Sequence, residues 1–286
     1  MPPQRSAPFF SDAPVFDRAD YARAIGRATG DKVLSSMLAQ HLKAGNIRRV
    51  ARGVFASVPK HADAETWSVD RFLAASRLRP GGVVAYHSAL ELHGYAYSEG
   101  FDLQVVAPGQ PGVLAADGFT CRFLKAPAPY GDADLTAIDR LGQSVRVTAL
   151  ECTIADLFDR TDLAGGAEEF ISSLDLIGRL DADRLTDRLA ALGNATAAGA
   201  AGWWLERRQE GLGPSTGVLE RLEGLAPRQN RYALGAAPGG GRLAPRWRVI
   251  LPEAILDARF EGLGCRRRRP RPCSVSPTRP ACRPGR

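Results

Sequence analysis

The sequence predicts an α+β protein: a small N-terminal unit of helices and a hairpin, a larger mixed α/β unit with a helical C-terminal part, and a polar tail. The 286 residues suffice for about two domains. Hydrophobic residues make up 44% of the chain and aromatic residues 7%, which is typical of a globular protein. Segments of helical and of strand-like periodicity both occur. We place the three units at residues 1–61, 62–261 and 262–286.

The formal net charge of +7 is distributed unevenly over these units. Residues 1–61 carry +6 and residues 62–261 carry −7, whereas residues 262–286 contain eight arginines and no acidic residue. The chain therefore has a basic head, an acidic body and a basic tail. Within the two globular units, the charge favours a nucleic-acid partner for the N-terminal one.

We find no segment in the sequence that is typical of export or membrane insertion. No apolar run approaches the roughly 18 residues of a spanning helix, and the opening residues have no apolar core of a signal peptide. Five cysteines without a C-x-x-C pair argue against a secreted disulfide framework. We expect Cys121 and Cys152 to be small, buried, reduced side chains. The prediction is a soluble, cytoplasmic protein with no membrane partner.

Four segments make up the N-terminal unit. The chain up to about Ala13 is expected to be a loose arm. Residues 17–26 and 31–44 carry apolar residues at helical spacing. Residues 47–58 form two β-prone stretches around Gly53, which predicts a small hairpin.

The larger unit begins after a linker at residues 58–66. Its predicted elements are, in order, a helix over 66–78, a strand passing into a helix over 83–94, strands at 101–108 and 119–127, a strand and helix over 144–160, helices over 167–180, 181–192 and 197–211, and a strand at 246–252. Thr148 and Glu151 have the spacing of a capping box, and Asp181 is a predicted N-cap. Residues 262–286 lack periodicity and apolar content, so we expect them to be disordered.

Helix, turn, helix and basic hairpin, in that order, are the elements of a winged helix-turn-helix. In this motif the second helix enters the DNA major groove, and the hairpin contacts phosphates or the minor groove. The expected DNA-binding residues are the polar side chains left outside the apolar face of helix 31–44, together with the hairpin arginines: Lys32, Ser35, Ser36, Gln40, Lys43, Arg48, Arg49 and Arg52. An ordinary solvated helix beside a charged hairpin is the alternative interpretation.

Catalytic motifs in the larger unit are weak. His87 and Glu91 are one helical turn apart, but the spacing suggests no third metal ligand. The glycine-rich stretches lack the pattern of a phosphate-binding loop, and Trp203-Trp204 is typical of a core. We expect no catalytic residue, metal or cofactor. The alternatives are a DNA-targeted nuclease or transferase that uses His87, Glu91 or acidic pairs, and a one-component repressor with a small effector.

Several segments together resemble the AbiEi family of antitoxins from abortive-infection, type IV toxin–antitoxin systems. The segments that carry the resemblance are LKAGNIRRVARGVFA (42–56), AYHSALELHGY (85–95), VRVTALECTIADLFDR (145–160), LAGGAEEFISSL (163–174) and GWWLERR (202–208). They fall within residues 15–255, nearly the whole globular part. Two features depart from the family: Cys152 stands where an arginine is common, and the tail has no counterpart.

The resemblance implies an N-terminal winged helix that binds repeats upstream of its own operon and represses it. It also implies an antitoxin domain, residues 62–261, that counteracts a nucleotidyltransferase-like toxin encoded nearby. Whether antitoxin and toxin bind each other directly is left open. The resemblance implies a DNA-binding role for the segment around Lys32–Arg52. It matches that segment as a whole and does not identify individual DNA contacts.

Overall fold

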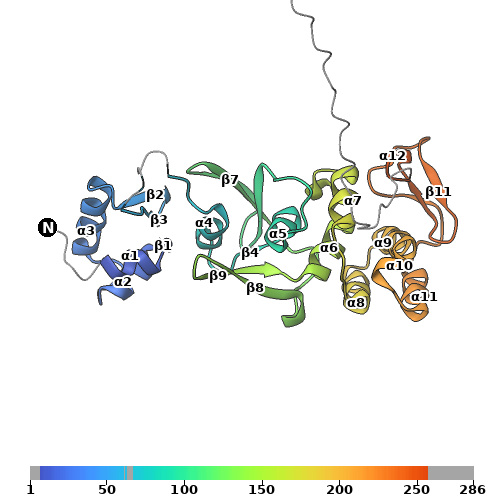
Figure 1. Ribbon diagram of the computed structural model, residues 1–286, viewed down its shortest axis with the longest axis horizontal. Helices are drawn as coiled ribbons and strands as arrows, with labels where there is room; N and C mark the ends of the chain where they lie inside the picture. Colours follow the sequence, from blue (N-terminus) through green and yellow to red (C-terminus); the bar gives the residue numbers. More distant parts are fainter. Residues whose placement is uncertain (1–6, 61, 63–66, 257–286) are drawn as a thin grey trace, which may run out of the picture.

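The computed structural model describes residues 7–60, 62 and 67–256. The described residues form an elongated series of parts, from the N-terminal unit through a six-stranded sheet to a helical region and a small C-terminal sheet (Figure 1). Helices and several separate sheets occur together, so the α+β class is confirmed. The predicted tail, residues 262–286, lies outside the described residues. No helix among the described residues has both the length and the apolar character needed to cross a membrane.

The N-terminal unit contains both predicted helices and the predicted hairpin. Its elements are α1 (Ala7–Asp12), β1 (Val15–Asp17), α2 (Arg18–Ala24), α3 (Lys32–Lys43), β2 (Ile47–Ala51) and β3 (Val54–Ser57). The three strands form an antiparallel sheet in the order β1-β3-β2. The Asp17 carboxylate caps α2, accepting from the Asp20 amide at 2.7 Å. After α3, Gly45 takes the left-handed conformation (φ 70°) that ends the helix.

The prediction of a loose arm up to about Ala13 is wrong for the described residues 7–12, which form α1. Phe9 and Phe10 pack against Phe16, with ring centroids 5.1 and 5.8 Å apart, and Phe10 stacks on Tyr21 at 5.7 Å. These aromatic contacts join residues that are not periodic in the sequence, so helical spacing could not reveal them. The segment closes the core of the N-terminal unit.

The middle of the molecule is a mixed six-stranded sheet. Its strands are β4 (Val83–Val84), β5 (Asp102–Val106), β6 (Gly112–Ala116), β7 (Phe119–Leu124), β8 (Leu135–Arg140) and β9 (Gln143–Thr148), in the order β6-β7-β5-β4-β9-β8. β5 and β7 run parallel, as do β4 and β9, and the remaining pairs are antiparallel. The sequence predicted β4, β5, β7 and β9 but neither edge strand.

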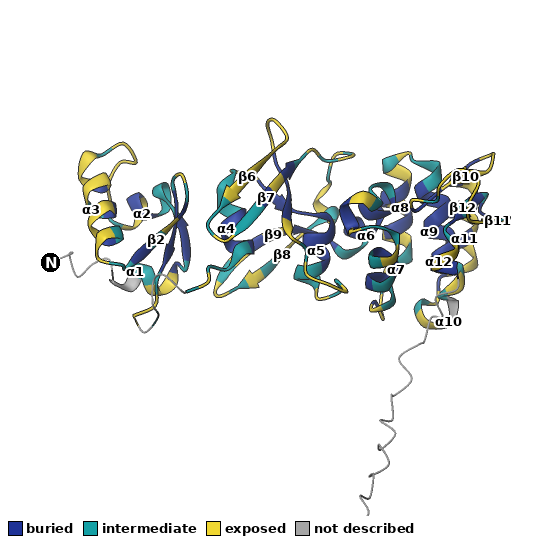
Figure 2. Ribbon diagram, turned by 90° about the horizontal axis from the view of Figure 1, so that it is seen from above, coloured by how far each residue is buried: buried dark blue, intermediate teal, exposed yellow. Residues whose placement is uncertain are grey.

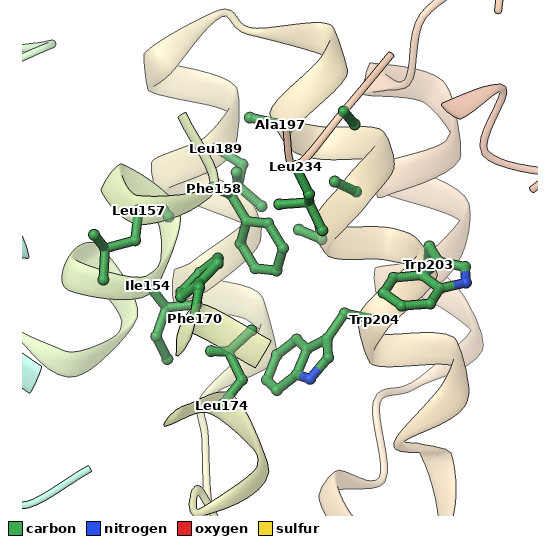
Figure 3. Packing of buried hydrophobic residues seen from close by; sticks show 14 of the residues in the cluster. Ile154, Leu157, Phe158, Phe170, Leu174, Leu189, Ala197, Trp203, Trp204 and Leu234 are labelled. Atoms are coloured by element: carbon green, nitrogen blue, oxygen red, sulfur yellow. The ribbon is translucent and has the colours of Figure 1, made fainter. Parts of the chain in front are cut away.

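Two helices pack on the sheet, α4 (Arg71–Leu78) and α5 (Tyr86–His93). The C-terminal half is mostly helical, with α6 (Leu150–Asp159), α7 (Ala167–Asp175), α8 (Ala182–Leu192), α9 (Ala195–Arg207), α10 (Gln209–Leu212), α11 (Thr216–Leu225) and α12 (Glu253–Leu256). A small sheet follows α11 with β10 (Arg231–Tyr232), β12 (Val249–Leu251) and β11 (Arg242–Ala244) side by side. Phe158, Phe170 and Trp204 meet in the core of this half (Figure 3), with the Phe158 and Phe170 rings 4.9 Å apart. Trp203 and Trp204 are both buried, as predicted.

The predicted capping box at α6 is wrong. The N-cap is Ala149 and makes no side-chain cap. The Thr148 hydroxyl instead lies 2.6 Å from the Thr153 hydroxyl, and the Glu151 carboxylate accepts from the Asp181 amide at 3.2 Å. The capping spacing is present, but both side chains find partners inside the fold. Asp181 does cap α8, as predicted.

The N-terminal unit packs on the sheet through a shared core. Val15, Val50 and Val54, from its three strands, are buried in the same cluster as Phe72 and Leu73 of α4. The hydrophobic core is therefore continuous across the predicted boundary between residues 61 and 62.

Polar contacts reinforce this junction. The Asp117 amide donates to the Val50 carbonyl at 3.0 Å, and the Val15 amide donates to the Gln143 side chain at 3.2 Å. Arg77 of α4 pairs with Asp20 of α2 at 3.4 Å. The N-terminal unit is thus held in a defined orientation on the body.

Candidate nucleic-acid interface

The outer face of α3 is exposed and polar (Figure 2). Its apolar side lies inward, where Leu34 and Leu38 are buried. Four side chains on the outer face make no hydrogen bond or ion pair within the described part of the chain: Lys32, Ser36, Gln40 and Lys43. Their donors and acceptors are therefore available to an outside partner. Val33 is the exception among the large apolar residues of this helix, because it is 45% exposed.

A buried histidine holds α3 against the rest of the unit. His41 is 2% exposed, and its Nε2 lies 3.0 Å from the Tyr21 hydroxyl. The Phe10 ring packs edge-on against it at 4.8 Å. Burial lowers the pKa of His41, so this ring adds no positive charge at neutral pH. Sequence reasoning missed His41; the signal was its place on the inner face, beside Leu34 and Leu38 at i−7 and i−3.

The turn between α2 and α3 is fixed by side-chain contacts. Arg18 donates to the Thr29 carbonyl at 2.6 Å and to the Ser35 hydroxyl at 2.7 Å. Asp31 caps α3 through the Val33 amide at 2.8 Å and pairs with Arg27 at 2.8 Å. Ser35 is exposed, as expected, but its hydroxyl is already engaged by Arg18. It serves the geometry of the turn as well as the outer face.

The two adjacent arginines of β2 point to opposite faces of the hairpin. Arg49 is paired with Phe55, which belongs to the core beneath the helices, and its guanidinium lies 5.9 Å from that ring. Arg48 is paired with Ala56, which belongs to the core shared with the body. Side chains alternate along a strand, so the separation follows from the register.

Arg48 is consequently engaged with the body. Its guanidinium forms an ion pair with Asp117 in the turn between β6 and β7, and it donates to the Trp67 carbonyl at 3.0 Å. Arg49 is exposed, and Arg52 is exposed in the turn before Gly53. The structure therefore exposes Lys32, Ser35, Ser36, Gln40, Lys43, Arg49 and Arg52, and it assigns Arg48 to the contact between head and body.

His87, the sequence's other candidate for chemistry, lies in a buried ionic cluster. It is 6% exposed, with Nδ1 3.2 Å from Glu91 and Nε2 3.3 Å from Glu169 of α7. Glu91 also accepts from the Gly100 amide at 2.9 Å and pairs with Arg71 of α4. The cluster ties α4, α5 and α7 together. Among the described residues, no three His, Cys, Asp or Glu side chains converge as metal ligands would.

Of the acidic pairs Asp132/Asp134 and Asp181/Asp183, three carboxylates have structural partners. Asp181 caps α8, and Asp183 pairs with Arg221 of α11 at 3.0 Å. Asp134 accepts from the Gly131 amide at 2.8 Å and lies 3.5 Å from Arg188. Each of these carboxylates is thus accounted for by a cap or an ion pair.

Cys152, the position at which the AbiEi family commonly has arginine, is buried beside an ion pair. Its Sγ lies 3.8 Å from the Asp156 carboxylate, which pairs with Arg188 of α8 at 3.0 Å. Burial raises the pKa of the Cys152 thiol, so it stays protonated and unreactive. Cys121 is buried as well, in agreement with the prediction for both thiols.

Comparison with known proteins gives a likeness in fold. No family model matches the chain, and a search of curated proteins gives no match. The crystal structure of the RV2827C protein from Mycobacterium tuberculosis superposes with a TM-score of 0.60, covering 90% of this chain and 94% of that one at 17% identity. At this identity the likeness concerns the fold alone.

Proposed function

We propose that the protein is a DNA-binding transcriptional regulator whose N-terminal unit is a winged helix-turn-helix. The observation that carries the proposal is the uncommitted polar face of α3: Lys32, Gln40 and Lys43 are exposed and have no partner within the described residues. The order α1-β1-α2-α3-β2-β3, with β3 between β1 and β2, supports it. In this motif α3 is the recognition helix, and the β2–β3 hairpin is the wing.

On the outer face of α3 and the β2–β3 hairpin, some side chains would supply affinity for DNA and others would determine which sequence is bound. Lys32, Lys43, Arg49 and Arg52 would pair with phosphates, which releases counterions and makes binding fall steeply with salt. Gln40 has the donor and acceptor that suit an adenine edge in the major groove. The junction with the body keeps the head in one orientation while it docks.

We further propose that the protein is an antitoxin that represses its own operon and counteracts a nucleotidyltransferase-like toxin. Support comes from the resemblance of residues 15–255 to AbiEi antitoxins. In this proposal residues 62–261 act without catalysis. The burial of His87 between Glu91 and Glu169 agrees with that assignment, because it leaves the imidazole unpresented to a substrate.

Fluorescence anisotropy with residues 1–261 and the chain's own upstream DNA tests the regulator. Omitting residues 262–286 removes eight arginines that would bind any polyanion. We expect a preference of about a thousandfold over scrambled DNA, which is typical of specific regulators. Equal binding to both sequences across a salt series would overturn the proposal.

Co-expression with the neighbouring gene tests the antitoxin role. We expect the full chain to restore growth that the neighbouring gene product inhibits. The variant Lys32→Ala/Gln40→Ala should still restore growth but lose repression, because its changes are confined to α3. If the full chain does not restore growth, the antitoxin role is wrong even where DNA binding is specific.

A further inference from the structure

A second basic surface lies at the end of the molecule opposite α3 (Figures 1 and 2). Residues 224–252, which include the small C-terminal sheet, contain five arginines and no acidic residue. They belong to a body whose net charge is −7, so the positive charge is locally concentrated. A concentration of one sign at one end indicates a partner of the opposite sign.

Some of these arginines have partners within the fold, and others leave their guanidinium groups free for an outside partner. Arg246 pairs with Glu206 at 2.6 Å and with Glu223 at 2.9 Å. Arg248 donates to the Pro227 carbonyl. Arg228 and Arg231, by contrast, are exposed, and their side chains make no hydrogen bond or ion pair within the described residues. The fold therefore leaves these two guanidinium groups uncommitted.

Arg228 and Arg231 line the same pocket, which has a volume of about 590 Å³. Gln229 and Thr196 contribute further polar side chains to its wall. The first amides of α9 border the pocket but are already capped, because Asn194 accepts from the Thr196 and Ala197 amides at 3.0 and 3.3 Å. An anion in this pocket would therefore depend on the two arginines.

An exposed aromatic side chain follows Arg231 in β10. Tyr232, next to Arg231 in β10, is 44% exposed, and its hydroxyl accepts from the Gly239 amide at 3.0 Å. This hydrogen bond fixes the ring at the surface of the small sheet. Tyr232 is not among the residues that line the pocket, and side chains alternate along a strand, so the two arginines alone are placed to bind a phosphate there.

We propose that Arg228 and Arg231 form a second nucleic-acid contact, at which their guanidinium groups bind the phosphodiester backbone. The contact is separate from α3 and does not depend on the function proposed for it. Duplex DNA and single-stranded RNA offer the same backbone chemistry, so the test includes both. An acidic surface of a second copy is the competing occupant.

The test is anisotropy with the full chain and Arg228→Ala/Arg231→Ala, using upstream duplex DNA and single-stranded RNA of the same length. Loss of two phosphate contacts should reduce the ratio of Kd at 200 mM salt to Kd at 50 mM about twelvefold on duplex DNA, or about sevenfold on RNA. An effect on only one of the two identifies the source of the backbone. Arg228→Lys/Arg231→Lys should retain most of the wild-type salt dependence, since it keeps both charges.

The matched control is Lys125→Ala/Arg179→Ala. Both side chains are exposed in the body without a partner among the described residues, and their removal changes the net charge equally. We expect it to leave the salt dependence unchanged. The proposal would be overturned if wild type, test variant and control variant had the same salt dependence of Kd on both nucleic acids. It would also be overturned if the test and control variants lost salt dependence equally. A change confined to self-association, measured by sedimentation, would assign the surface to a second copy instead.

The α3 variant Lys32→Ala/Gln40→Ala keeps the two proposals apart. If this variant loses its preference for upstream DNA, the loss reports on the α3 contact only, because both changed residues lie in α3. The C-terminal variant should retain that preference and lose only salt-dependent affinity. Failure of either result therefore identifies which of the two contacts is wrong.

Discussion

Neighbouring residues of the same type have different roles in this protein. Arg48 and Arg49 are adjacent in β2, yet Arg48 pairs with Asp117 of the body while Arg49 is exposed on the side of the helices. Strand alternation is the physical cause. Composition alone makes both arginines equal candidates, and only the register of the hairpin separates them.

Replacing Arg49 should therefore weaken DNA binding, whereas replacing Arg48 should weaken the contact between head and body. We expect Arg49→Ala to reduce affinity for all sequences and to flatten the salt slope by about one unit, the loss of one phosphate contact. Arg48→Ala should leave that slope unchanged and lower the melting temperature, because it leaves Asp117 without its partner. A salt series combined with thermal unfolding measures both; an unchanged slope for Arg49→Ala would contradict its assignment.

Gln40 is expected to determine sequence rather than affinity. Gln40→Ala should relax the preference at one base position by about 1–3 kcal/mol, because the side chain would bind a base edge. Binding to an operator library with each position varied in turn measures this. If every sequence weakens equally, Gln40 contacts phosphate.

His87 links the stability of the body to pH. Burial lowers the pKa of His87, but hydrogen bonds to Glu91 and Glu169, together with their charges, outweigh burial and the net pKa is raised. The groups around it are Glu91 of its own helix, Glu169 of α7 and, through Glu91, Arg71 of α4. A raised folded-state pKa means that protonated His87 stabilises the fold.

The contribution of His87 should be complete below the unfolded pKa of about 6.5 and lost as pH rises through the higher folded pKa. The difference in melting temperature between wild type and His87→Gln should therefore shrink as the pH rises above the unfolded pKa of about 6.5 and through the raised folded-state pKa. The comparison removes the effects of His41 and His93, whose pKa values are lowered by burial. A difference that grows with pH would show that the cluster does not hold a charged histidine.

At the scale of elements, α9 packs closely on the segment that leads into β12. Gly202 faces the ring of Trp247, and Gly199 faces the Trp247 backbone. Trp247 is 1% exposed, and its Nε1 donates to Glu206 of α9 at 2.7 Å. The glycines allow this close approach, so the small C-terminal sheet depends on them for its position.

Gly202→Ala should lower the free energy of unfolding by about 3 kcal/mol, because its Cβ would overlap the buried Trp247 ring. The control is Gly224→Ala in α11, where a Cβ meets nothing within 4 Å. That change should stabilise the protein by about 0.5–1 kcal/mol through helix propensity. Urea unfolding measures both; equal effects would mean that the ring can move aside.

Elements with one clearly apolar face could be predicted from the sequence, and edge strands could not. α3, α6 and α8 have their apolar residues at helical spacing. β6 and β8 are mostly exposed along their length, so no alternation marks them. They exist because β7 and β9 supply their hydrogen-bond partners. Such strands are a property of pairing rather than of local pattern.

At the scale of the whole molecule, head and body share one core. Because Val15, Val50 and Val54 are buried against α4, residues 1–61 alone would expose them. Each fully buried side chain of this kind contributes about 1.5–3 kcal/mol. Head and body therefore differ in net charge but do not have separate hydrophobic cores.

We expect residues 1–61 to unfold at a markedly lower temperature than the full chain. Removal of residues 262–286 is the control and should leave the melting temperature unchanged, because those residues have too little apolar content to join a core. Circular dichroism during heating measures both. A melting temperature for 1–61 equal to that of the full chain would show that the head is independently stable.

The sequence alone was sufficient for the α+β class, most helices, the strands with buried faces and the polar residues on the outside of α3. Those features depend on local periodicity, capping and charge, which neighbouring residues determine. The role of Arg48, the burial of His41, the partners of His87 and the pair of uncommitted arginines near β10 depend on contacts between residues far apart in the chain. A side chain's availability is set by what the fold places beside it, so the tertiary structure was needed to distinguish contacts within the protein from groups left for a partner.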